Sequence, residues 1–448
     1  MAVFDLTEGR VSSQLTRMTI PYFLGVSSMI LASMVETIYI GILGAKELAA
    51  YSFMFPVIMA LTSVSMGIGM GASSLIARAE GAGDREQVRR ITTHTMVLTL
   101  LLTGLLSAGS YVSLVPLFSL MGADGETLGY VVEFASVWVL GLVTFTIPMV
   151  FSTLLRALGI AKSPGYVMSV TSGMQLIISP ILIFGLFQVP ALGLVGSAWG
   201  FIAVGVLRIV ALGYLVAREN ILYIRNISDG FMTSTRAILH IGVPSMLSSL
   251  IGPITMAITI ALLAAHGDVI VAAFGVVSRI EMLVTMILGA LSSSVAPFVG
   301  QNWGARKIAR IHEGLRVSYR FCLVWGVICF VVLGPFGESV VRLINDQPEL
   351  VLAAGWFLII VPVSFGFLGV GQVAGSVFVA LGKPIPPTVL SIFRAIVIYI
   401  PLAMLLDSYW GYLGIFIAAS VSNVIFGVIA WAWQRSMFCK VTQGVQPS

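Results

Sequence analysis

Long apolar stretches, separated by short polar connections, follow one another along the whole chain. Each is long enough to cross the hydrocarbon core of a bilayer, which takes about 20 helical residues. Because a backbone in contact with lipid must satisfy its own hydrogen bonds, each stretch is expected to be helical. The pattern predicts an all-α polytopic membrane protein with twelve transmembrane helices, at residues 15–43, 47–77, 92–120, 127–154, 163–187, 192–217, 238–265, 269–297, 317–344, 350–379, 386–406 and 410–434.

Composition excludes a water-soluble protein of this length. Of the 448 residues, 58% are hydrophobic and 10% are charged, which is too few charges to cover a soluble surface. The first apolar stretch follows a polar start and lacks a small-residue cleavage pattern, so we expect it to stay in the mature protein rather than act as a signal peptide. Three cysteines, Cys322, Cys329 and Cys439, are too few for a disulfide framework or a metal site.

Basic residues are distributed unequally between the two predicted sides. With a cytoplasmic N-terminus, nineteen Lys and Arg residues fall on the cytoplasmic side, and only Lys46 and Arg342 fall outside. This asymmetry is the one that orients membrane proteins during insertion. It predicts a multi-pass protein of the plasma or inner membrane with both termini in the cytoplasm. The net charge of +5 then reflects orientation and gives no reason to expect a nucleic-acid partner.

The chain repeats itself at an offset of 223 residues. Pro21 pairs with Pro244 at this spacing, as do two further anchors, Gly81–Ala82 with Gly304–Ala305 and 157–159 with 380–382. Six spans separate the copies, so both copies cross the membrane in the same direction. We predict two six-helix lobes related by a pseudo-twofold axis along the membrane normal, with a cavity between them. The predicted domains are an N-lobe at 1–217, a cytoplasmic linker at 218–236 and a C-lobe at 237–448.

Catalytic and nucleotide-binding motifs are missing from the sequence. It contains no H-E-x-x-H, G-x-S-x-G, Walker A or Cys-x-x-Cys pattern. The glycine-rich run after Gly67 lies inside an apolar span, where close helix packing is the better interpretation. We therefore expect a transporter that has no cofactor and is driven by an ion gradient, and we do not expect an enzyme. A channel is not expected either, because the sequence shows no repeated pore lining.

Glu36 is the only charged residue of the stretch from Leu31 to Gly44. Ionisable groups inside membrane helices are costly and commonly mark a transport pathway. Ser33 and Tyr39 share its helix face and are candidate neighbours. The alternative is a permanently protonated acid with a structural role. Pro21, fifteen residues earlier, weakens the same helix and marks either a hinge or a static kink.

Other charges within the spans have a simpler explanation as interhelical pairs or as side chains reaching to the interface. They are Glu133, Arg208, Arg279, Glu281 and Arg394. Glu281 is the second candidate for proton transfer. An apolar cleft with one acid favours lipophilic cations, and methionines in the N-lobe helices would suit a promiscuous substrate surface; the candidates are Met29, Met34, Met66 and Met174.

Several motifs of this chain resemble the multidrug and toxic compound extrusion (MATE) family, and the DinF-like branch more than the NorM-like one. They are LGAKELAAYSFMFPV, GASSLIARAEGAGD, LRALG, HIGVPSML and VGQNWGARK. The resemblance implies twelve helices in two lobes with a V-shaped central cleft. It also implies export of amphiphilic, often cationic, compounds against sodium or proton uptake, and we expect the protein to act as a monomer in the bilayer.

The resemblance also concerns Glu36, because DinF-like members carry an ion-responsive aspartate at this position. Related members complete a cation site with an asparagine, an aspartate and a threonine; Gln175, Ser179 and Phe201 stand at these positions here. The NorM-like acid of the seventh helix falls at Gly252. Sodium prefers more oxygen ligands than one carboxylate, one amide and one hydroxyl provide, whereas a proton needs a single base.

These departures predict proton coupling through Glu36. By resemblance, protonation from outside would bend the first helix at Pro21, collapse the N-lobe cavity and displace the substrate outward. Two alternatives from the same superfamily stay open at this point. They are a sodium-coupled drug antiporter and a lipid-linked saccharide flippase.

Overall fold

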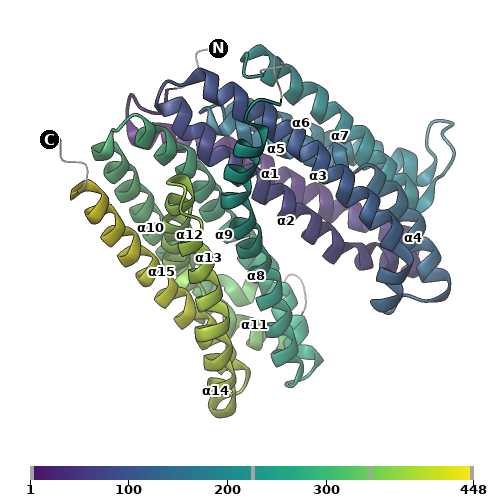
Figure 1. The fold of residues 1–448 in the computed structure, drawn as a ribbon. Helices are drawn as coiled ribbons and strands as arrows, with labels where there is room; N and C mark the ends of the chain where they lie inside the picture. The colour runs from purple at the N-terminus through teal and green to yellow at the C-terminus, as the bar shows by residue number, and fades with distance from the viewer. Residues whose placement is uncertain (1–4, 223–227, 343–345, 444–448) are drawn as a thin grey trace. The chain divides into compact units, whose positions relative to one another are not determined.

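The computed structural model describes residues 5–222, 228–342 and 346–443, and these residues form helices joined by short turns (Figure 1). Part of the predicted linker, residues 223–227, and the side chain of Cys439 lie outside the described structure. The first half contains α1 (Val11–Leu43), α2 (Ala45–Gly81), α3 (Arg85–Leu120), α4 (Gly125–Leu140), α5 (Leu142–Ala157), α6 (Lys162–Phe184) and α7 (Gly193–Arg218).

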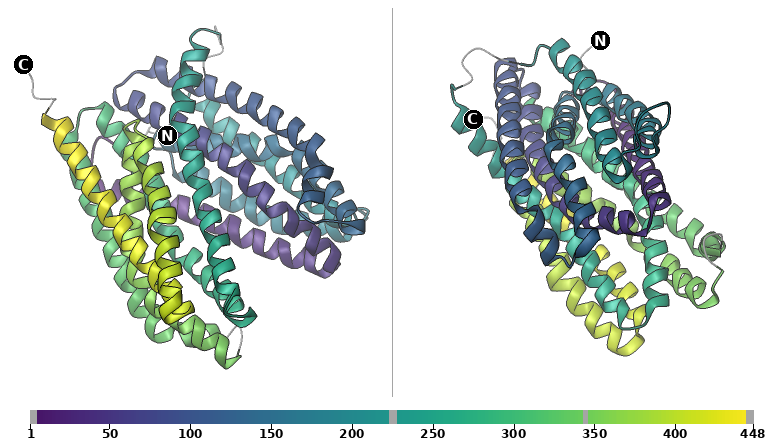
Figure 2. Two further views of the ribbon diagram at one scale, coloured as in Figure 1. Left: turned by 60° about the horizontal axis from the view of Figure 1, so that its bottom comes forward. Right: turned by 90° about the vertical axis from the view of Figure 1, so that its right-hand side faces the viewer.

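The second half follows a related order, which Figure 2 shows from two further sides. It contains α8 (Phe231–Ala264), α9 (Asp268–Gly304), α10 (Ile308–Arg342), α11 (Pro348–Ile360), the 3₁₀ turn η1 (Pro362–Ser364), α12 (Phe365–Ala380), α13 (Ile385–Ile392), the π-helical segment η2 (Phe393–Tyr399), α14 (Ile400–Trp410) and α15 (Tyr412–Gln443).

The prediction of twelve spans agrees with the described residues. Eleven helical stretches are long and apolar enough to cross a membrane, and α4 with α5 make a twelfth span that is bent by 46°. The bend is at Gly141, where an added Cβ would lie 2.3 Å from Cγ1 of Ile202 on α7. The lack of a side chain at Gly141 therefore leaves room for Ile202 of α7 at the bend.

Several helices extend beyond the apolar runs that predicted them. Helix α3 begins at Arg85 instead of residue 92, and α9 continues to Gly304 instead of residue 297. The start of α3 is fixed by Asp84, whose side chain accepts a hydrogen bond of 2.9 Å from the backbone N–H of Gln87. Capping and backbone hydrogen bonding continue a helix past the end of its apolar stretch, which hydropathy alone does not detect.

The chain forms two compact units, with one boundary inside α1 and another inside α8. One unit comprises Ile20–Val243 and the other comprises Leu6–Thr19 with Pro244–Ser448. Both boundaries lie next to the repeat-related prolines, Pro21 and Pro244. The lobe limits 1–217 and 237–448 stay a prediction.

The segment before α1 is held by the end of α9, the turn that follows and the start of α10, all within the second unit. The backbone N–H of Leu6 donates to Gln301 at 3.2 Å, and Asn302 donates to the Leu6 carbonyl at 3.0 Å. Lys307 donates to Thr7, and Arg310 donates to the carbonyls of Gly9 and Glu8. The VGQNWGARK motif, together with Arg310 just after it, therefore anchors the N-terminal segment.

Candidate functional site

Glu36 lies in the last third of α1, seven residues before the helix ends at Leu43, and is 6% exposed. Its carboxylate accepts three side-chain hydrogen bonds from two other helices. Gln175 Nε2 donates to Oε2 at 2.8 Å, Ser197 Oγ donates to Oε1 at 2.9 Å, and Ser179 Oγ donates to Oε1 at 3.4 Å. The sequence proposed Gln175 and Ser179 as neighbours, and both lie within hydrogen-bonding distance.

Close packing of α6 against α7 brings this set of donors together. Gln175 and Ser179 are four residues apart and therefore share one face of α6. An added Cβ on Gly200 of α7 would lie 3.0 Å from Ser179 Oγ, and one on Gly196 would lie 2.5 Å from the Leu182 carbonyl oxygen. Ser197, which the sequence analysis missed, reaches Glu36 because these glycines let the helices approach. The short run of small residues in GLVGSAWG could have indicated this close packing of α7 from the sequence.

A cavity of about 160 Å³ adjoins Glu36 within the first unit. It is lined by Met29, Ser33, Glu36, Tyr51, Ile58, Phe134, Trp138, Phe145, Gln175, Ser197, Phe201 and Arg208. Trp138 stacks on Phe201 at a centroid distance of 5.7 Å, and Phe145 lies 5.9 Å from Phe201. Aromatic rings therefore form one wall of a cavity that holds a single carboxyl group.

Arg208 lines the same cavity, from α7. It is 6% exposed, and its Nε donates to Thr171 Oγ1 of α6 at 2.8 Å. Its charge attracts that of Glu36. Of the two explanations given for Arg208, an interhelical pair or a side chain that reaches to the interface, its burial and its interactions with α1 and α6 fit the first.

The other predicted neighbours of Glu36 have different partners. Tyr39 donates to the Leu176 carbonyl at 3.3 Å. Pro180, four residues later in α6, has no N–H to bond that carbonyl, so the tyrosine hydroxyl supplies a donor in its place. Ser33 lines the cavity and interacts with the hydroxyl of Tyr51.

Among the predicted methionines, only Met29 lines this cavity. Met34 and Met66 are 40% and 38% exposed, and Met174 lies on α6 outside the lining set. Their proposed contact with substrate stays a prediction.

Pro21 lies at a close contact between α1 and α6. An added Cβ on Gly165 of α6 would lie 2.4 Å from the Pro21 carbonyl oxygen, so the glycine leaves room for the α1 backbone. The neighbouring Tyr22 ring is covered by the guanidinium of Arg156, 3.8 Å from the ring centroid. The role of Pro21 as a hinge stays a prediction.

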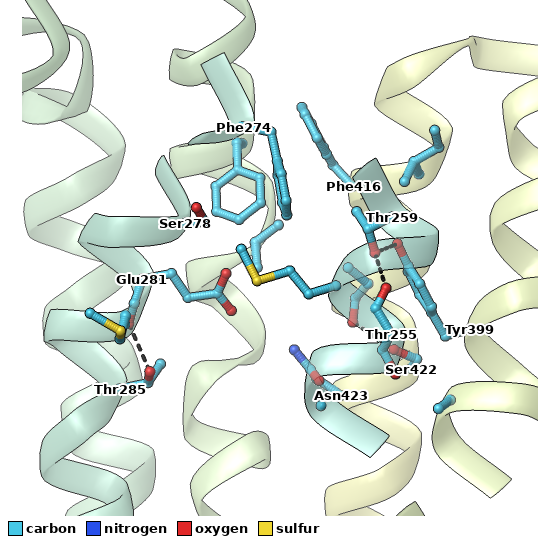
Figure 3. Close-up of a pocket in the computed structure, with 18 of the residues that line it drawn as sticks. Thr255, Thr259, Phe274, Ser278, Glu281, Thr285, Tyr399, Phe416, Ser422 and Asn423 are labelled. Carbon is cyan, nitrogen blue, oxygen red and sulfur yellow. Dashed lines mark hydrogen bonds between the residues drawn. The ribbon is translucent and has the colours of Figure 1, made fainter. Parts of the chain in front are cut away.

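A second cavity, of about 390 Å³, lies within the second unit and contains the other predicted acid, Glu281 (Figure 3). Within the described residues, no group of three or more His, Cys, Asp or Glu side chains is placed to hold a metal ion. Cys322 and Cys329 are buried free thiols.

Comparison with known proteins identifies the family. The MatE family model matches residues 21–181 and 244–405, which is more than half of the chain and covers both repeats. The chain belongs to the MATE family.

Related transporters match this MATE protein over nearly their whole length. A mutant of the Vibrio cholerae MATE transporter VcmN has a similar structure, with a TM-score of 0.92, 30% identity and coverage of 96% of this chain and 97% of that one. A FAD transporter of Shewanella oneidensis is 29% identical over 94% of this chain and 93% of its own. The probable multidrug resistance protein YoeA of Bacillus subtilis is 26% identical over 90% of this chain and 89% of its own.

These findings confirm an all-helical polytopic membrane transporter with the MATE fold, and they confirm that the protein is not an enzyme. The assignment to the DinF-like branch stays a prediction.

Proposed function

We propose that this MATE transporter exports amphiphilic compounds in exchange for protons, with Glu36 as the proton carrier. The observation that supports this most directly is the set of neutral donors around the carboxylate: one amide and two hydroxyls, all from side chains. A hydroxyl can donate or accept, and an amide carries both a donor and an acceptor. The set can therefore bond Glu36 in either protonation state.

Sodium coupling is less well supported by the same geometry. Gln175 points its amide nitrogen at Glu36, so its amide would have to turn before its oxygen could join one carboxylate and two hydroxyls as a sodium ligand. Arg208 lies in the same cavity, and its positive charge repels a metal cation. A proton that neutralises Glu36 needs no further ligand.

In the proposed cycle both termini are cytoplasmic and the proton enters from outside. Protonation removes the negative charge that Arg208 faces, and α1 then bends near Pro21 and closes the cavity. Protonation closes the cavity that the substrate needs, so proton uptake and substrate release are coupled.

The substrate class follows from the charges around the cavity. Because Arg208 offsets Glu36, the site does not select for cations alone, and amphiphilic aromatic compounds of either charge are suitable. Related proteins are named multidrug export proteins. The similarity to a FAD transporter over 94% of this chain makes FAD the first anionic substrate to test.

Transport in proteoliposomes tests the proposal. With an inward pH gradient we expect efflux of a lipophilic dye, and with an inward sodium gradient at equal pH we expect none. Glu36→Gln should abolish efflux, whereas Glu313→Gln, at an exposed carboxyl on α10, should leave it unchanged. Equal efflux under the sodium gradient would exclude proton coupling. Movement of a lipid-linked saccharide without dye efflux would favour the flippase.

A further inference from the structure

The larger cavity, in the second unit, occupies the position that corresponds by sequence repeat to the Glu36 cavity. Seven of its lining residues lie 223 positions after residues that line the smaller one: Gly252, Met256, Thr259, Phe274, Glu281, Phe357 and Val361 follow Met29, Ser33, Glu36, Tyr51, Ile58, Phe134 and Trp138. The two halves have therefore kept a cavity at the same place in the fold and changed its chemistry.

The acid of the second cavity lies on a different helix from the one that the repeat would predict. Thr259 stands where Glu36 does in the first half, and its hydroxyl lies 2.6 Å from that of Tyr399. Glu281 on α9 stands where Ile58 does. Figure 3 shows its carboxylate pointing into the middle of the cavity, toward the wall that carries Thr255, Thr259 and Asn423. In the described residues this carboxylate accepts no side-chain hydrogen bond, whereas that of Glu36 accepts three.

Arg394 is held in this cavity by contacts from two other side chains. Its Nη1 donates to Asn423 Oδ1 at 2.9 Å, and Asn423 in turn donates to Ser364 at 3.1 Å. The guanidinium also lies 5.2 Å from the centroid of the Phe426 ring. This one hydrogen bond leaves most of the five N–H groups of Arg394 for a ligand.

A π-helical segment places Arg394 and Tyr399 on the cavity wall. Within η2 the N–H of Ile400 bonds the carbonyl of Ala395, five residues earlier. Such segments are rare and are frequent at functional sites. The corresponding stretch of the first half, in α6, is ordinary α-helix.

The charges in this cavity do not balance. Arg279 and Arg394 line it with a single acid, Glu281. If Glu281 is ionised, one positive charge remains uncompensated, and if it is protonated, two remain. In either protonation state of Glu281 this cavity therefore carries a net positive charge, whereas the Glu36 cavity has one arginine for one acid.

Aromatic rings form much of the remaining wall. Phe357 contacts Phe274 and Phe416 edge to face, with centroid distances of 6.0 and 5.1 Å. A volume of about 390 Å³ is in the range of small-molecule sites. Edge and face contacts of this kind suit a planar ring.

We propose that this cavity binds planar aromatic compounds that carry a carboxylate, phosphate or sulfonate, and that Arg394 anchors the anionic group. The proposal rests on the proposed export of amphiphilic compounds and specifies the class that the second half recognises. It does not depend on which ion drives transport. An arginine suits this role because its planar fork matches an oxyanion with two parallel hydrogen bonds.

The test compares two ligands with one ring system. Riboflavin 5′-phosphate and riboflavin differ by the phosphate, and quenching of flavin fluorescence reports binding to the purified transporter in detergent without any gradient. We expect the phosphate to tighten binding to the native protein by about tenfold or more, as a charge-assisted pair does. Arg394→Gln should remove this difference and Arg394→Lys should retain part of it.

Two further variants locate the site. Arg208→Gln, in the other cavity, should keep the tenfold difference. Glu281→Gln should increase it, because it removes the repulsion of the phosphate while Arg394 stays in place, and this variant tests the proposal even if Arg394→Gln does not fold. Equal binding of the two ligands, no binding of either, loss of the difference in Arg208→Gln, or a smaller difference in Glu281→Gln would each overturn the proposal. Failure of proton coupling in liposomes would leave these results unaffected.

Discussion

At the scale of single residues, the carboxylate of Glu36 has donors of unequal strength. Ser197 lies 2.9 Å from Oε1, whereas Ser179 lies 3.4 Å from the same atom. Hydrogen bonds weaken with distance, and those to a charged acceptor contribute about 1.5–3 kcal/mol when well formed. Ser197, which no sequence pattern assigned to the site, should therefore matter more than Ser179, which was predicted.

Replacing the closer serine should change the pH dependence of transport. Ser197→Ala removes a donor that stabilises the charged carboxyl, so protonation becomes easier and the pH of half-maximal efflux should move upward, by about one unit for each 1.4 kcal/mol lost. Ser179→Ala is the matched variant and should move it less. Efflux measured over a pH series in proteoliposomes checks both. A larger effect of Ser179→Ala would contradict the geometry described here.

At the scale of helices, the two repeat-related prolines have different surroundings. In the first half Pro21 faces Gly165 of α6, which has no side chain. In the second half the residue 223 positions after Gly165 is Thr388, whose hydroxyl donates to the Pro244 carbonyl at 2.9 Å. The proline carbonyl of α8 therefore faces a hydroxyl, which also lies 3.0 Å from the Pro384 carbonyl, where that of α1 faces a glycine; a hinge at Pro21 stays a prediction.

A methyl group at the contact between α1 and α6 should destabilise the protein. In Gly165→Ala the new Cβ would lie 2.4 Å from the Pro21 backbone oxygen, and relieving that overlap should cost about 1–3 kcal/mol. Gly173→Ala, on the same helix, meets nothing within 4 Å and should be neutral or stabilising by about 0.5–1 kcal/mol. Thermal unfolding in detergent distinguishes them. An unchanged midpoint for Gly165→Ala would show that the helices separate easily there.

At the scale of the whole molecule, α1 belongs to both compact units. Its first residues, together with the segment that precedes them, are fixed in the second unit by Asn302, Lys307 and Arg310, and the part that carries Glu36 belongs to the first unit. A change around Glu36 therefore acts on a helix whose start is anchored elsewhere in the chain.

Removing the main anchor should release the N-terminal segment. Arg310→Ala deletes hydrogen bonds to Gly9, Glu8 and Gln14, and trypsin cleavage after Arg10 should become faster by about tenfold, since a loss near 1.4 kcal/mol favours local opening by that factor. Arg316→Ala, at an exposed position on the same helix, is the control. Equal cleavage rates in the two variants would mean that Asn302 and Lys307 hold the segment without Arg310.

Much of the architecture could be predicted because it depends on local sequence. The number of spans follows from apolar length, and the repeat follows from a constant spacing of residues such as Pro21 and Pro244. Gln175 and Ser179 could be assigned to Glu36 because a known family places polar residues at those positions. The predicted helix ends were less accurate, because capping residues such as Asp84 extend a helix beyond its apolar run.

The sequence by itself determined that the chain crosses the membrane twelve times, in two similar halves, with one isolated acid in its first helix. Only the tertiary structure decided which groups face that acid, because Ser197 and Arg208 are more than 160 residues away from it and reach it through the close packing of α6 and α7. The same holds for Glu281 and Arg394. They are more than 100 residues apart along the chain, and only the tertiary structure places Glu281 of α9 and Arg394 of the π-helical segment on the walls of one cavity.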